Sequence, residues 1–233
     1  MNAYLTTILI CLPFAGALVV LLAPLPAYWL GSFAALVSLV EVGFWITDAF
    51  RFDFGSSELQ FAQNRSWFSD LGISFHVGQY AFSVWFVGMT VVVMAACVIY
   101  GWWVGRDRAR AYFTLMLFLT GAIVGVFTAQ DVLLFYAFFE AMLIPLYALI
   151  GVWGGGERLR ATLTFVVYTT VGSLLMLAAV IVLGLQQGTF DLTQMSPSTS
   201  TWLFLGFAVA FAIKSPLFPL HGWLPITYRE SPA

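Results

Sequence analysis

The chain has 233 residues, of which 61% are hydrophobic and only 9% charged, and its formal net charge is −2. Soluble domains carry about 25% charged residues, so the composition excludes an ordinary soluble domain and predicts an all-α, polytopic integral membrane protein. The sequence contains no basic region of the kind that binds nucleic acid, and neither cysteine has the spacing of a disulfide framework or a metal site.

Apolar segments of about 20 residues are long enough to cross the bilayer as helices. The sequence contains seven, which cover residues 4–23, 29–48, 80–104, 111–129, 131–152, 162–185 and 202–221. We divide the chain into residues 1–110, with three crossings and an outer loop, and residues 111–233, with the other four. Only "AQD" separates the fourth crossing from the fifth, so these two should form a tight helical hairpin.

Loops and charges predict the orientation of the chain in the membrane. Residues 51–78 are polar and aromatic and could hold a short hairpin, whereas residues 186–201 are a turn-rich connector. Arginine is enriched in cytoplasmic loops, so an outer amino terminus and a cytoplasmic carboxyl-terminal end fit best. The cytoplasmic loops then hold Arg106, Arg108, Arg110, Arg158, Arg160 and Arg229, and the outer loops only Arg51 and Arg65. Because the chain stops at "YRESPA", just after an interrupted seventh crossing, we expect a truncated sequence.

Three ionisable residues lie well inside crossings: Glu41, Glu140 and Lys214. A charge at the centre of a membrane helix costs about 2.5–3.5 kcal/mol on insertion scales, so each is a candidate functional residue. Glu41 lies in a helix without a proline, and helix packing and a proton path remain equally open roles for it.

Glu140 lies near the middle of the fifth crossing, and Tyr136 and Tyr147 should share its helical face. Pro145 cannot donate a hydrogen bond to the carbonyl of Ala141, which would leave a polar opening beside the glutamate. The structural alternative is a protonated glutamate that only packs against a neighbouring helix.

Lys214 lies deep in the seventh crossing and is followed by Pro216 and Pro219. These prolines should break the helix by freeing the carbonyls of Ala212 and Ser215. Broken helices at membrane depth occur where the backbone lines a cavity or faces protein. The alternative for Lys214 is a lysine that extends toward the membrane surface.

His221 would share a face with Lys214, about 10 Å away, if helical geometry resumed after the break. We expect Glu140 and Lys214 to form a buried ion pair and His221 to pass on the proton. For His221 an interfacial, merely hydrogen-bonded role is the alternative. No redox centre, phosphate loop or activated nucleophile is evident, so we expect no catalytic residue, metal or cofactor in this chain.

Three stretches carry a resemblance to a known family: "FYAFFEAMLIPLYALIGVWGG", "TFVVYTTVGSLLML" and "AIKSPLFPLHGWLP" with "YRESPA". They resemble the antiporter-like membrane subunits of proton-pumping NADH:quinone oxidoreductase, respiratory complex I, and most closely subunit M, the counterpart of mitochondrial chain 4. The fold is also similar to subunits of multisubunit sodium/proton antiporters and proton-pumping membrane hydrogenases. The family fold contains two inverted repeats, each with a broken helix, and this chain would hold its amino-terminal half.

The resemblance implies roles for Glu140, Lys214 and His221 in proton translocation, driven by electron transport in a bacterial plasma membrane. NADH, flavin, iron–sulfur clusters and quinone would be bound by other subunits, and neighbouring antiporter-like subunits would be the partners. Ile226 stands where the family usually has an aspartate after "HGWLP", and Gln79 and Tyr80 depart from its pattern before the third crossing. A sodium/proton antiporter subunit, or a partial product with only a structural role, remain the alternatives.

Overall fold

The computed structural model describes residues 4–68 and 72–231. The chain divides into two compact units, each described here by itself. Unit 1 comprises Met1–Arg65 and Phe75–Gln130, and unit 2 comprises Ser66–Ser74 and Asp131–Ala233.

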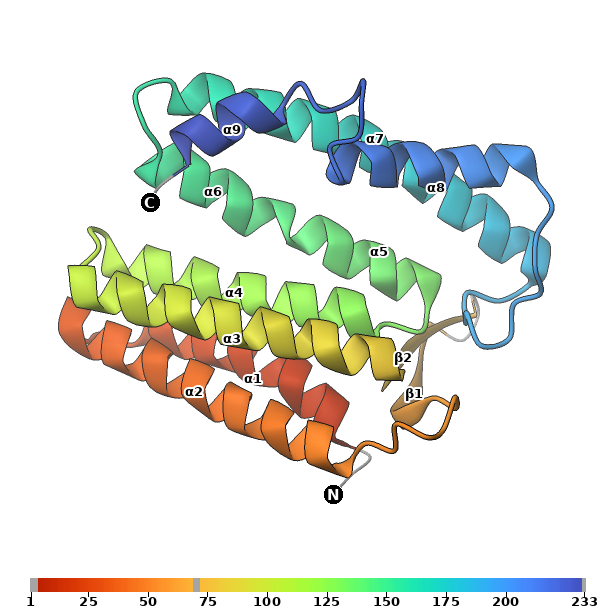
Figure 1. Ribbon diagram of the computed structural model, residues 1–233, viewed down its shortest axis with the longest axis horizontal. Helices are drawn as coiled ribbons and strands as arrows, with labels where there is room; N and C mark the ends of the chain where they lie inside the picture. The colour runs from red at the N-terminus through yellow and green to blue at the C-terminus, as the bar shows by residue number, and fades with distance from the viewer. Residues whose placement is uncertain (1–3, 69–71, 232–233) are drawn as a thin grey trace. The chain divides into compact units, whose positions relative to one another are not determined.

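Unit 1 is a bundle of four helices (Figure 1). They are α1 (Leu5–Leu22), α2 (Ala27–Arg51), α3 (Ala81–Val104) and α4 (Ala109–Thr128). All four are long and apolar enough to span a membrane, which confirms the first four predicted crossings. Within the bundle, α1 packs mainly against α4 and α2 mainly against α3.

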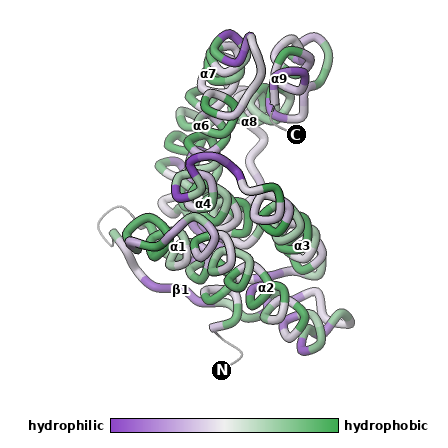
Figure 2. The backbone as a smooth tube through the Cα atoms, turned by 90° about the vertical axis from the view of Figure 1, so that its left-hand side faces the viewer, coloured by the Kyte–Doolittle hydropathy of each residue, from purple (hydrophilic) through white to green (hydrophobic). Residues whose placement is uncertain are grey.

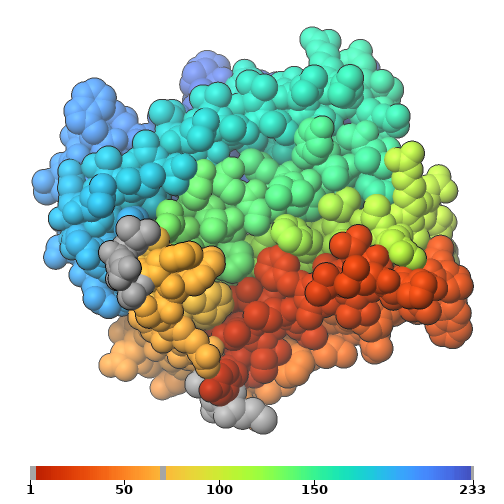
Figure 3. Space-filling view, turned by 180° about the vertical axis from the view of Figure 1, so that it is seen from behind, coloured from red at the N-terminus to blue at the C-terminus, as the bar shows by residue number. Residues whose placement is uncertain are grey.

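The loop between α2 and α3 forms a two-stranded sheet of β1 (Gln60–Phe68) and β2 (Ile73–Gln79). The predicted short hairpin is therefore present, and it is an addition to the predicted all-α class. An isolated hairpin is only marginally stable in water, so its contacts with a helix matter. Thr6 Oγ1 donates to the Phe61 carbonyl at 3.1 Å, and Thr7 Oγ1 donates to Gln63 Oε1 at 2.6 Å. These bonds hold β1 against the start of α1. In Figure 3, which is seen from behind, the red start of the chain lies beside the yellow-orange hairpin segment.

In unit 2, the described residues form five further helices (Figure 1). They are α5 (Val132–Ala141), α6 (Leu143–Trp153), α7 (Arg158–Gln187), α8 (Thr201–Lys214) and α9 (Leu224–Glu230). The fifth predicted crossing is split between α5 and α6, and α7 is the sixth. The seventh is broken, because α8 is only 14 residues long and turns separate it from α9. Among the described residues, six spans are thus long and apolar enough to cross a membrane, the fifth of them interrupted at Met142, and the seventh crossing is broken into two short helices.

Large apolar side chains are exposed along the helices rather than hidden inside the bundles. Phe50, Trp103 and Trp202 are 87%, 81% and 83% exposed. Figure 2 shows apolar residues along the helices and hydrophilic residues gathered at helix ends and turns. Lipid is the solvent that such helices require, so the chain is an integral membrane protein.

Candidate functional site at the two broken helices of unit 2

The fifth crossing breaks at Met142, between α5 and α6. Pro145 lies in the first turn of α6, where backbone N–H groups lack a partner within the helix in any case, so its missing N–H fits that position. Glu140 is the penultimate residue of α5. The polar opening predicted beside Glu140 from Pro145 stays a prediction, and the structure places the interruption of the crossing at Met142, three residues before Pro145.

The start of α5 is fixed by Asp131, which the sequence analysis did not single out. Its Oδ1 accepts hydrogen bonds from the N–H groups of Leu133 and Leu134, at 2.9 and 3.1 Å, and its Oδ2 accepts from the N–H of Ser74 at 2.9 Å. A carboxylate at this position satisfies helix N–H groups that otherwise lack a partner. The side chain is completely buried, so it anchors the helix that carries Glu140.

The seventh crossing breaks directly after Lys214, the last residue of α8. We predicted that Pro216 frees the carbonyl of Ala212, and this is wrong, because that carbonyl accepts from the N–H of Leu217 at 2.8 Å. The carbonyl of Ile213 accepts from the indole Nε1 of Trp223 at 2.9 Å. Irregular backbone at membrane depth must find partners within the protein, and these two bonds supply them.

Lys214 faces an aromatic ring instead of a carboxylate. Its Nζ lies 4.6 Å from the ring centroid of Phe139, which is within the range of a cation–π contact. Phe139 is 6% exposed, and its ring contacts Phe135 and Phe211, with centroids 5.9 and 6.4 Å away. The ring is therefore a fixed platform for the ammonium.

Glu140 and Lys214 are brought together without touching. Lys214 Nζ interacts electrostatically with Glu140. Both Nζ and Glu140 Oε1 are buried, and neither has a hydrogen-bond partner among the described residues. The predicted direct ion pair is therefore not formed in this arrangement. We call Glu140 and Lys214 the open pair: the two groups are close, do not bond to each other, and neither has another hydrogen-bond partner among the described residues.

Tyr136 lies one helical turn before Glu140 on α5. Its side chain lies near Ser173 of α7 and interacts electrostatically with Glu140. Tyr147, in contrast, is 49% exposed. The shared face predicted for both tyrosines assumed an unbroken helix, and the break at Met142 lies between Glu140 and Tyr147.

His221 lies in the turns that separate α8 from α9 and is exposed. Its ring contacts that of Phe218, with centroids 5.7 Å apart. Pro219 follows Phe218 in the same turns, through a cis peptide bond. Helical geometry does not resume between Lys214 and His221, so the expected spacing along one helical face does not apply.

Glu41 lies in the middle of α2 in unit 1 and is 1% exposed. Its Oε1 has no hydrogen-bond partner among the described residues. Its setting is taken up again below.

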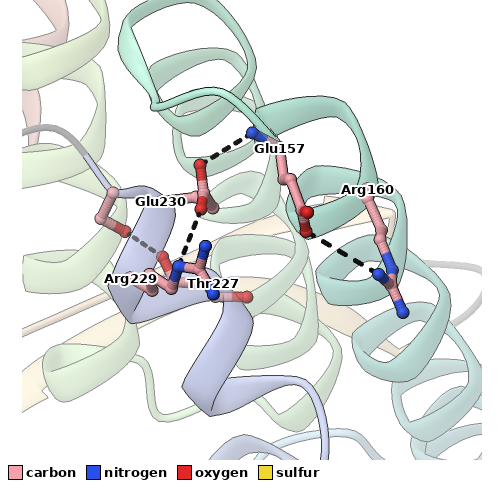
Figure 4. Close-up of polar contacts among 6 residues, drawn as sticks. Glu157, Arg160, Thr227, Arg229 and Glu230 are labelled. Atoms are coloured by element: carbon pink, nitrogen blue, oxygen red, sulfur yellow. Dashed lines mark hydrogen bonds and ion pairs between the residues drawn. The ribbon is translucent and has the colours of Figure 1, made fainter.

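A residue that the sequence analysis missed is Glu230, near the end of α9. Its Oε2 accepts from the N–H of Glu157, at the start of α7, at 2.9 Å (Figure 4). Its carbonyl accepts from the N–H of Gly155 at 2.9 Å. Arg229 Nε lies 3.4 Å from the other carboxylate oxygen. A negative charge at a helix amino terminus is stabilising, so Glu230 ties α9 to the loop between α6 and α7.

Replacing Glu230 by alanine is expected to lower stability by about 1–3 kcal/mol, because it removes the hydrogen bond that this buried carboxylate accepts from the Glu157 N–H. The measurement is the midpoint of thermal unfolding of the detergent-solubilised protein. Glu157→Gln is the matched control, since that side chain is 53% exposed and pairs only with Arg160 across the surface. Equal loss in both variants would show that the Glu230 contact is not special.

Comparison with known proteins shows which family the chain resembles. Residues 129–233, which contain the whole site of unit 2, match the family described as NADH:quinone oxidoreductase/Mrp antiporter, transmembrane. The chain is 34% identical to NADH-ubiquinone oxidoreductase chain 4 of Arabidopsis thaliana, over 96% of this chain and 47% of that protein. It is 37% identical to NADH-quinone oxidoreductase subunit M of Rhodobacter capsulatus, over 78% of this chain and 38% of that protein. The chain belongs to this family of antiporter-like membrane subunits.

Solved structures agree with the family assignment. A chain in the structure of respiratory complex I from Thermus thermophilus with bound NADH has a TM-score of 0.80 and 34% identity, over 97% of this chain and 47% of that one. The Mrp complex from Dietzia sp. has a TM-score of 0.82 at 19% identity, which shows a shared antiporter-like fold. The chain thus spans less than half the length of the relatives that it matches.

Proposed function

We propose that the chain serves as a proton-translocating membrane subunit of a NADH:quinone oxidoreductase. The observation that carries this proposal is the open pair of unit 2: the ammonium of Lys214 and the carboxyl of Glu140 are buried and close, and neither has a hydrogen-bond partner among the described residues. Unpaired ionisable groups inside a membrane protein are costly, and they mark proton paths.

The proposed mechanism has the pair alternate between an open and a closed arrangement. In the open arrangement the ammonium rests on the Phe139 ring, and the lone carboxyl avoids a buried charge by holding a proton. In the closed arrangement the flexible lysine side chain reaches Glu140 and makes the ionised carboxylate tolerable, so the proton leaves. A motion that separates the pair reloads the glutamate. Tyr136 and His221 are the candidates for exchanging the proton with its surroundings.

At the level of the complex, the chain contributes to an enzyme without carrying the redox chemistry itself. Electrons would pass from NADH through flavin and iron–sulfur clusters to quinone in other subunits. Neighbouring antiporter-like subunits, which relatives named for NADH:quinone oxidoreductase imply, would deliver the driving motion. The location we propose is a bacterial plasma membrane.

Purification of the tagged chain from its own cells tests the proposed function. We expect NADH oxidation coupled to quinone reduction to copurify with the chain, and proton transport in vesicles to be independent of sodium. Copurification with antiporter subunits, without NADH oxidation but with sodium-dependent proton movement, would replace this proposal by the antiporter alternative.

Cysteine labelling tests the proposed orientation, with an outer amino terminus. Cys11 and Cys97 are first replaced by alanine, and single cysteines are introduced at Ser57 or Gly156, which are both exposed. Gly156 is suitable because an added side chain meets no atom within 4 Å there, whereas at Gly155 it would lie 2.5 Å from Glu230 Oε2. An impermeant reagent outside the cell should label Ser57→Cys only. Labelling of Gly156→Cys instead would reverse the orientation.

A further inference from the structure

A second group of buried polar side chains lies in unit 1, where α2 meets the end of the hairpin and the start of α1. Its members are Thr6, Asp48 and Gln79, each 0% exposed. They come from three elements, and no step of the proposed mechanism uses them.

This group has fewer hydrogen-bond donors than acceptors. Gln79 Nε2 donates to Thr6 Oγ1 at 3.2 Å and to Asp48 Oδ1 at 3.3 Å, and the Thr6 hydroxyl donates to the Phe61 carbonyl at 3.1 Å. Every available donor is thereby used. Asp48 Oδ2 and Gln79 Oε1 remain buried, without a partner among the described residues. Turning the amide around does not help, because its oxygen would then face Asp48 Oδ1 and a hydrogen would be needed between them.

No described cationic side chain compensates Asp48. Among the described residues, the side chain that contacts the Asp48 carboxyl is the neutral Gln79, whose Nε2 lies 3.3 Å from Oδ1. An ionised carboxylate buried with neither a cation nor a full set of donors costs several kcal/mol. A proton on the carboxyl removes the charge and supplies a hydrogen that the group lacks.

Glu41 repeats this situation along the same helix. It precedes Asp48 by seven residues, which places both on one face of α2, about 10 Å apart. Glu41 is 1% exposed, and its Oε1 has no partner among the described residues. One turn further, Ser38 is 2% exposed and its Oγ is equally without a partner. One face of α2 therefore carries three buried polar side chains, Ser38, Glu41 and Asp48, each with an oxygen that lacks a hydrogen-bond partner among the described residues.

We propose that Asp48 and Glu41 are two proton-binding sites of unit 1, each holding its proton as a carboxylic acid, and that Gln79 orients Asp48. A proton fits better than a metal cation, because the amide presents its nitrogen to the carboxyl and its oxygen points elsewhere. Unit 1 would then hold protons independently of the Glu140 and Lys214 pair. This inference does not rest on the function proposed for unit 2.

Infrared spectroscopy of the purified protein at neutral pH tests the inference, since the C=O stretch of a carboxylic acid is distinct from the bands of a carboxylate. The difference spectrum between the parent and Asp48→Asn should show the loss of one carboxylic-acid band that shifts in D₂O. Glu41→Gln should remove a second band. Gln79→Leu should shift the Asp48 band without removing it, because Oδ1 loses its donor. Asp53→Asn, at an exposed loop position, is the matched control and should change nothing in this region.

Two results would overturn the inference. If neither Asp48→Asn nor Glu41→Gln removes a carboxylic-acid band, both carboxyls are ionised. If a band attributed to Asp48 disappears when sodium is added to the parent protein, the site binds a cation. Should Asp48→Asn fail to fold, the shift expected for Gln79→Leu still decides the state of Asp48.

Discussion

Replacing Glu140 by glutamine is expected to abolish most proton transport coupled to NADH oxidation, while the complex still assembles. Glutamine has nearly the same shape, so the packing of α5 against its neighbours is kept. It cannot lose or gain the proton, so the open and closed arrangements no longer differ in proton content. The measurement is proton uptake into vesicles that contain the intact complex, set against the rate of NADH oxidation and the amount of complex.

Two further variants make this result specific. Glu140→Asp should retain part of the coupled transport, because the carboxyl remains and only its reach is shortened. Glu58→Gln, an exposed position in the outer loop, should leave transport unchanged. A complex with Glu140→Gln that assembles and pumps near the parental rate would contradict the mechanism and leave Glu140 a packing residue.

Replacing Lys214 by alanine is expected to remove as much coupled transport as Glu140→Gln. Without the ammonium the closed arrangement cannot form, and the glutamate keeps its proton. The double variant should transport little less than either single variant, because the two residues act as a unit. Lys214→Arg keeps the charge and should retain part of the activity. The same vesicle assay measures all of these variants.

If the double variant lost the sum of the free-energy effects of the two single variants, Glu140 and Lys214 would not act as a unit. If the fractional activities of the single variants multiply, Glu140 and Lys214 act in separate steps. The open pair would then be a coincidence of packing around Phe139.

The crossings and the break in the seventh of them could be predicted from the sequence. Span length depends on composition alone, and Pro145 and Pro216 act on the backbone within one helical turn. The contact made by Lys214 could not be predicted, because it depends on the placement of the Phe139 ring on another helix. The same limit explains the error at Ala212: a proline identifies the donor that is lost, but the replacement, Leu217, depends on how the chain turns afterwards.

The polar contacts that connect distant segments were also beyond prediction. Gln79 reaches Asp48 across 31 residues and Thr6 across 73, and Glu230 reaches Glu157 across 73. No periodic pattern marks such pairs. The sequence signals were the bare facts that Asp48 lies near a helix end and that Glu230 stands in the "YRESPA" segment.

The second half of the seventh crossing, α9, is bonded at one end to the loop before α7 and at the other end to the last turn of α8, next to Lys214. The carboxylate of Glu230 fastens α9 to the surface loop before α7. At the other end of α9, the Trp223 indole donates a hydrogen bond to the carbonyl of Ile213, the residue directly before Lys214. The two bonds therefore connect the loop before α7, through the short helix α9, to the last turn of α8. We expect displacement of this loop to reach the residues next to Lys214 through these two bonds.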